Sequence, residues 1–260
     1  MANPFILKLE HGAELDDEDR RVLERAVAKV ERIDADKDLT REGDKPAHVH
    51  VVLEGFAVRY KDLPDGGRQI MAFLVPGDMC DLHVHILGEM DHSIGTLTPC
   101  RLAYIPQRTV DELTGRHPRI NRALWWATLV DESTLREWLV SMGRREAGQQ
   151  TAHLFCELLC RLHTVGLASE DGFELPVTQD ELGDTLGLSA VHVNRVLQQL
   201  RKDGLITLDG KRLTIHDVAR LEAFAGFDPS YLHLDRLLRR ERIRACAASA
   251  GGRERGPNLP

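Results

Sequence analysis

Polar side chains in residues 178–200 have the types and the spacing that nucleic-acid recognition needs. His192, Asn194, Arg195 and Gln198 fall away from the apolar residues of this stretch when it is drawn as a helix. Their imidazole, amide and guanidinium groups offer the hydrogen-bond donors and acceptors that base edges and phosphates require. This face of the helix therefore indicates a surface that meets solvent or a ligand.

Two short helices joined by a tight turn must position these side chains. Thr178 is a natural N-cap, and Glu181, three residues later, completes a capping box. Gly187 supplies the turn, and Ser189 caps the second helix. The apolar positions recur at helical spacing, namely Leu182, Thr185, Leu186, Val193, Val196, Leu197 and Leu200. The pattern predicts a helix-turn-helix, whose second helix fits the DNA major groove, with an ordinary helical hairpin as the alternative.

The residues that follow predict a wing. Residues 201–206 close the helix at Gly204 and enter a strand, Asp209-Gly210 is a hairpin signal, and residues 213–215 form a returning strand. Together these elements predict a winged helix-turn-helix.

Composition and charge distribution agree with a protein that binds DNA. The chain has 260 residues, 42% of them hydrophobic, which is enough for two modest domains. The net charge is −7, but residues 189–202 carry two arginines, one lysine and no acid, and residues 236–255 carry seven arginines. Acidic residues concentrate instead at residues 14–19. A protein with a negative net charge and a positively charged recognition helix is suited to release non-specific DNA readily.

The sequence also predicts where the protein works. No apolar run approaches the ~18 residues of a membrane span, and no signal peptide is recognisable, so we expect no membrane association and a cytoplasmic location. The 5 cysteines are odd in number and scattered, which fits reduced thiols rather than a disulfide framework.

Before the helix-turn-helix, the chain changes its hydrophobic period twice. Residues 16–32 predict an amphipathic helix, and four short segments (49–53, 56–60, 69–74 and 101–105) predict strands separated by turn residues. Such regular turns are typical of an antiparallel barrel or jelly roll. Residues 110–142 predict a long helical region with Pro118 in a first helical turn, and residues 146–164 predict a second helix. A long apolar helix in mid-chain usually packs against a partner helix, most simply its own copy.

Barrel, long helix and winged helix-turn-helix, in this order, resemble the Crp/Fnr superfamily of bacterial transcription regulators over about residues 15 to 230. The markers are Leu53-Glu54-Gly55, Asp65-Gly66-Gly67-Arg68, Pro76-Gly77-Asp78 and, most specific of all, the helix-turn-helix of residues 178–200. The resemblance implies an α+β chain with a cyclic-nucleotide-binding-like β-barrel at residues 1–109 and a dimerisation helix at 110–143. It further implies a winged helix-turn-helix DNA-binding domain at 144–230. The arginine-rich composition beyond it, with Ala, Gly and Pro toward the end, predicts a basic, disordered tail at 231–260. The implied partners are a second copy of the chain, a palindromic double-stranded DNA site and RNA polymerase.

The resemblance also assigns DNA contacts. Arg195 matches the position that contacts a base edge, where its forked donors fit guanine O6 and N7. Asn194 or His192 adds a base or phosphate contact. Many relatives carry a glutamate where Val191 stands and use it to accept a hydrogen bond from cytosine. Valine cannot do this, so we expect a different half-site, with apolar contact to a thymine methyl. The whole predicted DNA-binding set is Thr178, Gln179, Ser189, Ala190, Val191, His192, Asn194, Arg195 and Gln198, of which Thr178, Gln179 and Ser189 look like phosphate positions.

The barrel departs from two effector subtypes of the family. Relatives that bind cyclic nucleotides carry a Gly-Glu pair for the ribose and a later Arg-Ser or Arg-Thr for the phosphate. Residues 77–83 read Gly-Asp-Met-Cys-Asp-Leu-His instead, and no arginine lies between Arg68 and Arg101. A buried phosphate without a cation is costly, so cyclic AMP and GMP are disfavoured as effectors. Iron–sulfur relatives use an N-terminal cysteine cluster, and this chain has no cysteine before Cys80.

A third subtype, the carbon-monoxide-sensing haem regulator, is partly similar. It follows Gly-Asp-Met with an axial histidine four residues later, a spacing that His83 matches, but its cysteine ligand position holds Asp81 and its N-terminal proline ligand has no counterpart. The alternative is that His83 and His85 alternate along a strand-like segment and merely cover the barrel. His48 and His50 share one strand face and could bind a metal with His83 or His92, or be simply solvated.

The predicted effector-pocket residues come from this region and from the long helix. Trp125 and Trp126 lie where that helix would pass the pocket, and both could couple ligand occupancy to the DNA-binding domains or merely pack at the dimer seam. Cys156 and Cys160, four residues apart on a helix, read as packing residues, with thiol sensing as the alternative. The full candidate set is Cys80, Asp81, His83, His85, His92, Ser93, Trp125 and Trp126.

The identity of the effector stays open at this point. A small effector other than the usual cyclic nucleotide is one possibility, and a ligand-independent regulator whose barrel is only a dimer scaffold is another. The motifs that would indicate an enzyme, such as Gly-x-x-x-x-Gly-Lys or His-Glu-x-x-His, are missing from the sequence, so a metal enzyme of the cupin kind is the weakest reading.

Overall fold

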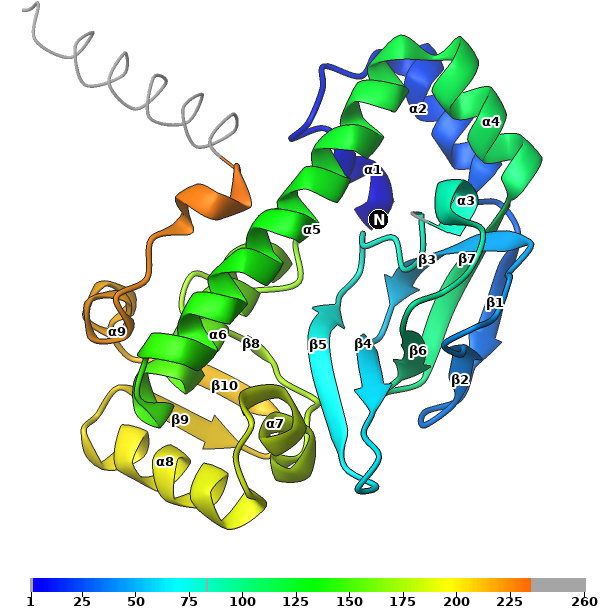
Figure 1. Cartoon of the computed structure of the whole chain (residues 1–260). Helices are drawn as coiled ribbons and strands as arrows, with labels where there is room; N and C mark the ends of the chain where they lie inside the picture. Colours follow the sequence, from blue (N-terminus) through cyan, green and yellow to red (C-terminus); the bar gives the residue numbers. More distant parts are fainter. Residues whose placement is uncertain (1, 83, 235–260) are drawn as a thin grey trace, which may run out of the picture.

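The computed structural model describes residues 2–82 and 84–234, and of His85 it describes the backbone alone. Figure 1 shows a β domain and a DNA-binding module with a small sheet, with the long helix α5 (Pro118–Arg144) running beside both. The predicted α+β fold class is confirmed. Among the described residues, no helix combines the length and the apolar character needed to cross a membrane.

Two antiparallel sheets form the β domain. One has the strand order β2-β6-β4-β5 and the other β1-β7-β3. Their inward side chains, such as Val52, Leu74, Ile94 and Leu102, meet in one core. The strands are β1 (Val30–Ile33), β2 (Asp38–Thr40), β3 (His48–Glu54), β4 (Ala57–Asp62), β5 (Arg68–Leu74), β6 (Ser93–Thr96) and β7 (Cys100–Pro106).

The helix predicted for residues 16–32 is wrong in its second half. The helix α2 (Asp17–Ala26) begins at a capping box formed by Asp16 and Asp19, and it ends before β1. Val30 pairs with Ala103 of β7, so the end of the predicted helix is an edge strand. Val30 and Ile33 are β-branched, and a sheet partner decides their conformation against a short helical pattern.

Two short helices of the β domain were not predicted. The helix α1 (Pro4–Leu9) starts at Asn3, whose side chain accepts a hydrogen bond from the Phe5 backbone. The helix α3 (Val84–Leu87) occupies the segment for which a strand-like alternation was expected, so that expectation is wrong. His83 itself lies outside the described residues, as does the side chain of His85.

The helical region predicted for residues 110–142 is divided into two helices. The helix α4 (Gln107–Arg116) stops at His117, whose φ of −121° and ψ of 85° are not helical, and α5 begins at Pro118. Proline disfavours a helical conformation in the preceding residue, which explains the break. With 27 residues, α5 is about 40 Å long. Its buried residues Ile120, Leu124 and Ala127 share a core with Phe5 and Leu9 of α1.

The DNA-binding module follows directly. Its helices are α6 (Ala147–Thr164), α7 (Gln179–Leu186), α8 (Ala190–Lys202) and α9 (Val218–Ala225), with the short 3-10 helix η1 (Pro229–Leu232) at the end. Its sheet has the order β8-β10-β9, made of β8 (Gly172–Glu174), β9 (Ile206–Asp209) and β10 (Arg212–Ile215). The strand β8 was not predicted.

The module is packed firmly against the β domain. Phe73 of β5 and Phe155 of α6 are both fully buried and belong to one continuous hydrophobic cluster. Arg68 Nε donates to Asp184 Oδ2 over 2.8 Å, and Gln69 donates to the Thr185 carbonyl over 3.3 Å, so α7 rests on β5. The sheet that contains β5 therefore forms part of the surface against which the helix-turn-helix packs.

The predicted tail boundary falls inside an ordered element. Leu232, counted as tail by the sequence, is 1% exposed and packs within η1. The rest of the predicted tail, residues 235–260, lies outside the described residues.

Candidate nucleic-acid interface and interdomain cavity

The helix-turn-helix forms as its local caps predict. Thr178 Oγ accepts the Glu181 amide over 3.2 Å, and Glu181 Oε2 accepts the Thr178 amide over 2.6 Å, which confirms the capping box. Gly187 ends α7 in the left-handed conformation, and Ser189 Oγ accepts the His192 amide over 3.3 Å at the start of α8. These local hydrogen bonds fix the direction in which α8 leaves the turn.

Close packing in the turn depends on a glycine that sequence reasoning did not single out. A Cβ atom at Gly183 would lie 2.5 Å from the Leu188 carbonyl oxygen. Only glycine therefore allows the end of α7 to approach the start of α8 this closely. A glycine inside an apolar helical pattern was the available signal.

One face of α8 is buried and the other is open to solvent. Val193, Val196, Leu197 and Leu200 are buried in the module, as predicted. Val191 is 70% exposed on the opposite side. His192, Arg195 and Gln198 are also exposed, whereas Ala190 and Asn194 are half-buried. In Figure 1, α8 lies at the edge of the molecule away from the β domain.

Asn194 is held by its neighbours, while Arg195 is available. Asn194 Nδ2 donates to Gln179 Oε1 over 3.1 Å, and Gln198 Nε2 donates to Asn194 Oδ1 over 2.9 Å. These three side chains form a polar string across α7 and α8. Within residues 2–82 and 84–234, no side chain forms a hydrogen bond or ion pair with Arg195. Its guanidinium can therefore meet a ligand without first breaking an internal contact.

The predicted wing is present and adds a basic residue that the sequence reasoning missed. Asp209 pairs with Arg212 at the end of the β9–β10 hairpin, and Gly210 has a positive φ of 56°. Lys211 is exposed at the tip. The signal was its position directly after the Asp-Gly turn, because wing tips commonly lie near the phosphate backbone.

The predicted effector-pocket residues do not form one site. Asp81 is fully buried and binds His50 twice, with Oδ1 accepting the His50 amide over 2.7 Å and Oδ2 lying 2.6 Å from Nδ1. Cys80 is fully buried, and this burial raises the pKa of its thiol. Ser93 Oγ accepts the Glu42 amide over 3.1 Å. These three residues stabilise the β domain internally, whereas His92 lines a cavity.

The two adjacent tryptophans point into different surroundings. Trp126 stacks on His11 with 6.2 Å between ring centroids and closes over Gly12, next to α1. Trp125 is 54% exposed and lines an apolar groove with Ile86 and Leu87 of α3. Successive helical residues are about 100° apart, so one face of α5 cannot hold both.

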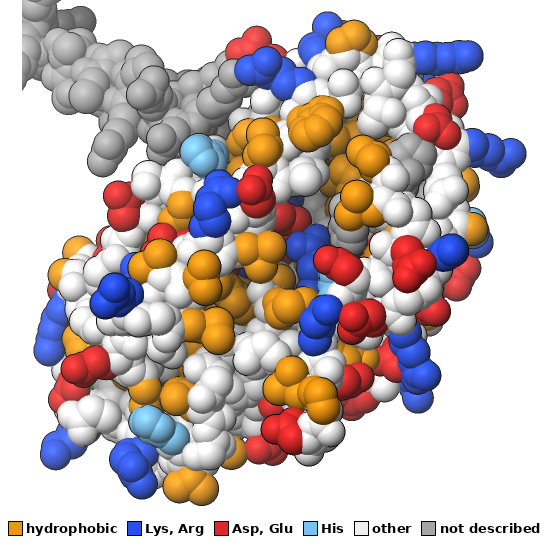
Figure 2. Space-filling model, in the orientation of Figure 1, with side chains coloured by type: hydrophobic (Ala, Val, Ile, Leu, Met, Phe, Trp, Pro, Cys, Tyr) orange, Lys and Arg blue, Asp and Glu red, His pale blue; other side chains and the backbone are white. Residues whose placement is uncertain are grey.

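A cavity of about 350 Å³ lies between α1, the β domain and α5. Its apolar wall includes Phe5, Leu9 and Met79, and its charged wall includes Lys8, Arg59 and Asp131. The space-filling view shows a hollow between the β domain and α5, next to the band of hydrophobic side chains (Figure 2). Arg59 was not predicted; the available signal was a single arginine within the apolar strand segment 56–60.

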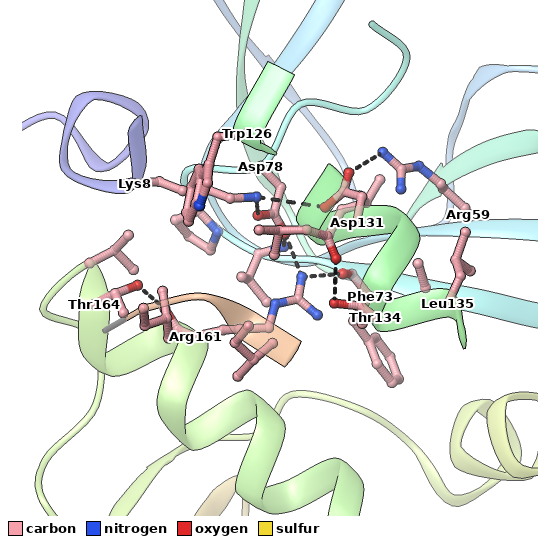
Figure 3. A pocket seen from close by; sticks show the side chains of 18 of the residues that line it. Lys8, Arg59, Phe73, Asp78, Trp126, Asp131, Thr134, Leu135, Arg161 and Thr164 are labelled. Atoms are coloured by element: carbon pink, nitrogen blue, oxygen red, sulfur yellow. Dashed lines mark hydrogen bonds and ion pairs between the residues drawn. The ribbon is translucent and has the colours of Figure 1, made fainter. Parts of the chain in front are cut away.

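The cations of this cavity are already engaged. Arg59 donates to the carbonyls of Cys80 and Met79 over 3.0 and 2.9 Å and to Asp131 Oδ2 over 3.1 Å. Lys8 Nζ lies 2.6 Å from Asp78 Oδ1 and 3.8 Å from Asp131 Oδ1. Figure 3 shows this chain of contacts from Arg59 through Asp131 to Lys8 and Asp78.

Asp78, predicted only as a turn marker, is the centre of a buried charge cluster. Besides Lys8, it binds Arg161 of α6, with 2.7 Å between Asp78 Oδ2 and Arg161 Nη2. Burial alone would raise the pKa of Asp78, but Lys8 and Arg161 lower it to about 2. Arg161 Nη1 also pairs with Glu157 over 2.9 Å, and Nη2 donates to the Phe73 carbonyl over 2.7 Å. An arginine of the DNA-binding module thus reaches into the β domain.

The other histidines and cysteines that could bind a metal or react as thiols lie in other surroundings. His50 is buried rather than solvated, which corrects one of the two readings of the His48 and His50 pair. Among the described residues, no three His, Cys, Asp or Glu side chains lie close enough together to hold a metal ion. Cys156 is buried as predicted, and burial, followed by Glu222, raises the pKa of Cys160 to about 12. A thiol with a raised pKa is a poor nucleophile at neutral pH.

Comparison with known proteins identifies both halves of the chain. Residues 30–117 match the model of the cyclic nucleotide-binding domain, and residues 137–224 match that of the Crp-like helix-turn-helix domain. The transcriptional activator protein FnrL of Cereibacter sphaeroides is 30% identical over 190 residues, which cover 72% of this chain and 76% of the relative. The nitrogen fixation regulation protein FixK of Bradyrhizobium diazoefficiens is 33% identical over 189 residues, covering 71% and 77%.

A solved structure shows the same fold. FixK2 from Bradyrhizobium japonicum superposes with a TM-score of 0.69 at 24% identity, covering 77% of this chain and 98% of that chain. These matches confirm the resemblance on which the sequence reading rested, and they confirm a DNA-binding regulator rather than an enzyme. The chain belongs to the Crp/Fnr family of transcription regulators.

Proposed function

We propose that this protein binds a palindromic operator as a homodimer and that a small ligand in the cavity between α1, the β domain and α5 modulates this binding. The observation that carries the proposal is the exposed guanidinium of Arg195, which no described side chain engages, on the solvent face of a well-capped α8. An arginine in this position can donate two hydrogen bonds to guanine O6 and N7. Exposed His192 and Gln198 lie on the same face as Arg195.

The exposed face of α5 supports the homodimer. Trp125, Leu129 and Leu139 lie on the side of α5 opposite its buried residues, and Leu139 is 72% exposed. Figure 2 shows hydrophobic side chains gathered along the course that α5 takes in Figure 1. Their near-heptad spacing is typical of a helix that packs against its own copy. Monomeric proteins rarely expose an apolar stripe of this kind. Contact with RNA polymerase stays a prediction from the family resemblance.

The size and chemistry of the cavity support a small effector that is not a cyclic nucleotide. A volume of about 350 Å³ is at the lower end of ordinary ligand pockets. A cyclic phosphate would need a cation, yet Arg59 and Lys8 are bound to carbonyls, Asp131 and Asp78. The residues present therefore do not fit the phosphate of a cyclic nucleotide. For haem, the candidate ligand His83 lies outside the described residues.

The test of the DNA-binding proposal is operator affinity. An operator is first selected from a random duplex pool with the full-length protein, and its sequence is expected to be palindromic. Arg195→Ala should then lose about 5- to 150-fold in operator affinity for each half-site, the equivalent of about 1–3 kcal/mol for a bidentate guanine contact, and keep non-specific binding. Arg144→Ala, which removes an exposed arginine at the end of α5, is the matched control. Equal operator affinity of wild type and Arg195→Ala would contradict the assignment.

A separate measurement addresses the effector. Native mass spectrometry and an absorbance spectrum of freshly purified protein would identify a co-purified ligand, and a Soret band would indicate haem. Operator affinity before and after removal of that ligand then tests modulation. High affinity that does not respond to any cavity ligand would favour the scaffold alternative.

A further inference from the structure

We propose that Lys8 of α1 holds the DNA-binding module in place through Asp78, whose carboxylate binds both Lys8 and Arg161 of that module. Occupation of the cavity beside Lys8 then determines how firmly the two recognition helices of a dimer are positioned. This inference rests on the proposed operator binding and names how that function is regulated. It assigns the regulatory contact to α1 and the Gly77-Asp78 turn.

The contacts join parts of the chain that are far apart in sequence. Lys8 and Asp78 are 70 positions apart, and Arg161 and Asp78 are 83 positions apart. Each carboxylate oxygen has its own cation: Oδ1 binds Lys8 over 2.6 Å and Oδ2 binds Arg161 over 2.7 Å. Oδ2 also accepts the Val75 amide over 2.8 Å. One buried carboxylate is thus the common partner of α1, α6 and the turn after β5 (Figure 3).

The position of α1 is closely determined by the same turn. Gly77 has a φ of +99°, and a Cβ atom there would lie 2.8 Å from the Pro4 carbonyl oxygen and 3.3 Å from Lys8 Cβ. The backbone of α1 therefore rests directly on the turn that carries Asp78. A displacement of α1 must move Lys8 away from this carboxylate.

Burial makes the cluster sensitive to the loss of one partner. The side chain of Asp78 is 3% exposed, and those of Lys8 and Arg161 are each 15% exposed. Removing one member of a buried ion pair leaves an uncompensated charge, which is strongly destabilising. Lys8 also forms part of the wall of the 350 Å³ cavity, so water can reach Asp78 when Lys8 is withdrawn. A hydrated carboxylate attracts Arg161 more weakly, because the local dielectric constant rises.

Arg161 connects Asp78 to further buried residues of the DNA-binding module and of α5. Its other nitrogen, Nη1, pairs with Glu157, whose Oε2 accepts Trp138 Nε1 of α5 and the Tyr231 hydroxyl of η1, each over 2.9 Å. The cluster therefore connects α1 to α5, α6 and η1. The exposed face of α8 stays accessible in this docked arrangement. We accordingly assign the docked arrangement to the state that binds the operator.

The experiment uses the full-length Lys8→Met variant, which keeps an unbranched, flexible side chain one atom shorter than lysine and removes the charge. A dimer with loosely held modules should bind the palindrome about tenfold more weakly, while its affinity for a DNA with one half-site stays unchanged, because one module alone needs no fixed spacing. Hydrogen exchange should rise at the Val75 amide, which Asp78 protects. Lys45→Met is the matched control, because Lys45 is 71% exposed and pairs with Glu89 at the surface.

A second variant, Asp78→Asn, keeps the side-chain shape and removes the shared charge. It should reproduce the loss of palindrome affinity and raise exchange in α1 as well as at Val75. Unchanged or tighter palindrome binding by Lys8→Met would overturn the proposal, and so would an equal loss on the palindrome and the half-site. Failure of the proposed function itself looks different, since wild-type protein would then bind neither DNA specifically while the exchange readout remains measurable.

Discussion

The Tyr231 hydroxyl donates a hydrogen bond of 2.9 Å to Glu157 Oε2, across 74 positions of sequence. Glu157 is fully buried, and its carboxylate also binds Trp138 and Arg161. Burial, followed by Glu157, raises the pKa of Tyr231, so the phenol remains a donor throughout the physiological range. The segment after α9 therefore completes the hydrogen bonding of a buried charge and belongs to the folded domain.

Tyr231→Phe should destabilise the protein. The substitution keeps the ring packed and removes one of the donors to a buried carboxylate, which costs about 1.5–3 kcal/mol for a hydrogen bond to a charged group. Urea unfolding measures the loss. Tyr104→Phe is the control, because the Tyr104 hydroxyl forms no hydrogen bond with a described residue. Equal stability of Tyr231→Phe and wild type would show that the contact does not contribute.

The stability of the protein should fall in acid because of His153. Burial, followed by Arg145, lowers the pKa of His153 to about 4, although Glu137 raises it. The unfolded chain therefore binds a proton below pH 6.5 that the folded chain does not take up until about pH 4. This contribution is complete above pH 6.5 and is lost as the pH falls through that window, by up to about 3 kcal/mol.

Urea unfolding of wild type and His153→Gln between pH 7 and pH 4 measures this dependence, since the variant should lack the His153 part of the slope. Parallel profiles for wild type and His153→Gln would refute the assignment.

Leu139→Glu should convert the proposed dimer into a monomer. Leu139 is largely exposed on α5, so the substitution leaves the fold intact and places charges opposite each other in a paired helix. Light scattering after size-exclusion chromatography gives the mass, and the affinity for a palindromic operator should fall to that for a half-site. Leu167→Glu, at an exposed leucine outside α5, is expected to stay dimeric. A dimeric Leu139→Glu would place the interface elsewhere.

Val191→Glu should change the preferred half-site without changing stability. A residue that is 70% exposed contributes little to the fold, within about 0.5 kcal/mol. A glutamate there can accept a hydrogen bond from cytosine N4, whereas valine offers only apolar contact with a thymine methyl. Binding sites selected from a random duplex pool, once with wild type and once with Val191→Glu, show the change in the preferred half-site directly. Identical selected sites would mean that residue 191 does not face a base.

The sequence predicted the helix-turn-helix well because the signals there are local. Thr178, Glu181, Gly187 and Ser189 act on neighbours within a few residues, so no distant part of the chain has to be known. Val30 shows the opposite case, since its conformation is decided by pairing with Ala103 in a strand 73 positions away, the difference between residue numbers 103 and 30.

The interdomain cluster could not be predicted for the same reason. Lys8, Arg59, Asp131 and Arg161 lie on four separate elements, and nothing in the spacing of one indicates the others. No arginine lies between Arg68 and Arg101, and Arg59 reaches the cavity from β4, the strand before this segment. Asp81 and Cys80 were near the right turn, but both side chains are fully buried, Cys80 in the core between the two sheets and Asp81 against His50.

The hydrophobic cluster that contains Phe73 and Tyr60 of the β domain together with Phe155 and Leu158 of α6 limits how this protein can be recombined. A chimera that exchanges residues 144–230 for the corresponding part of another regulator would carry α6 without the strand surface that it was matched to. Such exchanges should succeed only when the outward side chains of β4 and β5 travel with the new module. The two parts of the protein therefore share one hydrophobic cluster, and substitutions on one side of it constrain which residues the other side can accept.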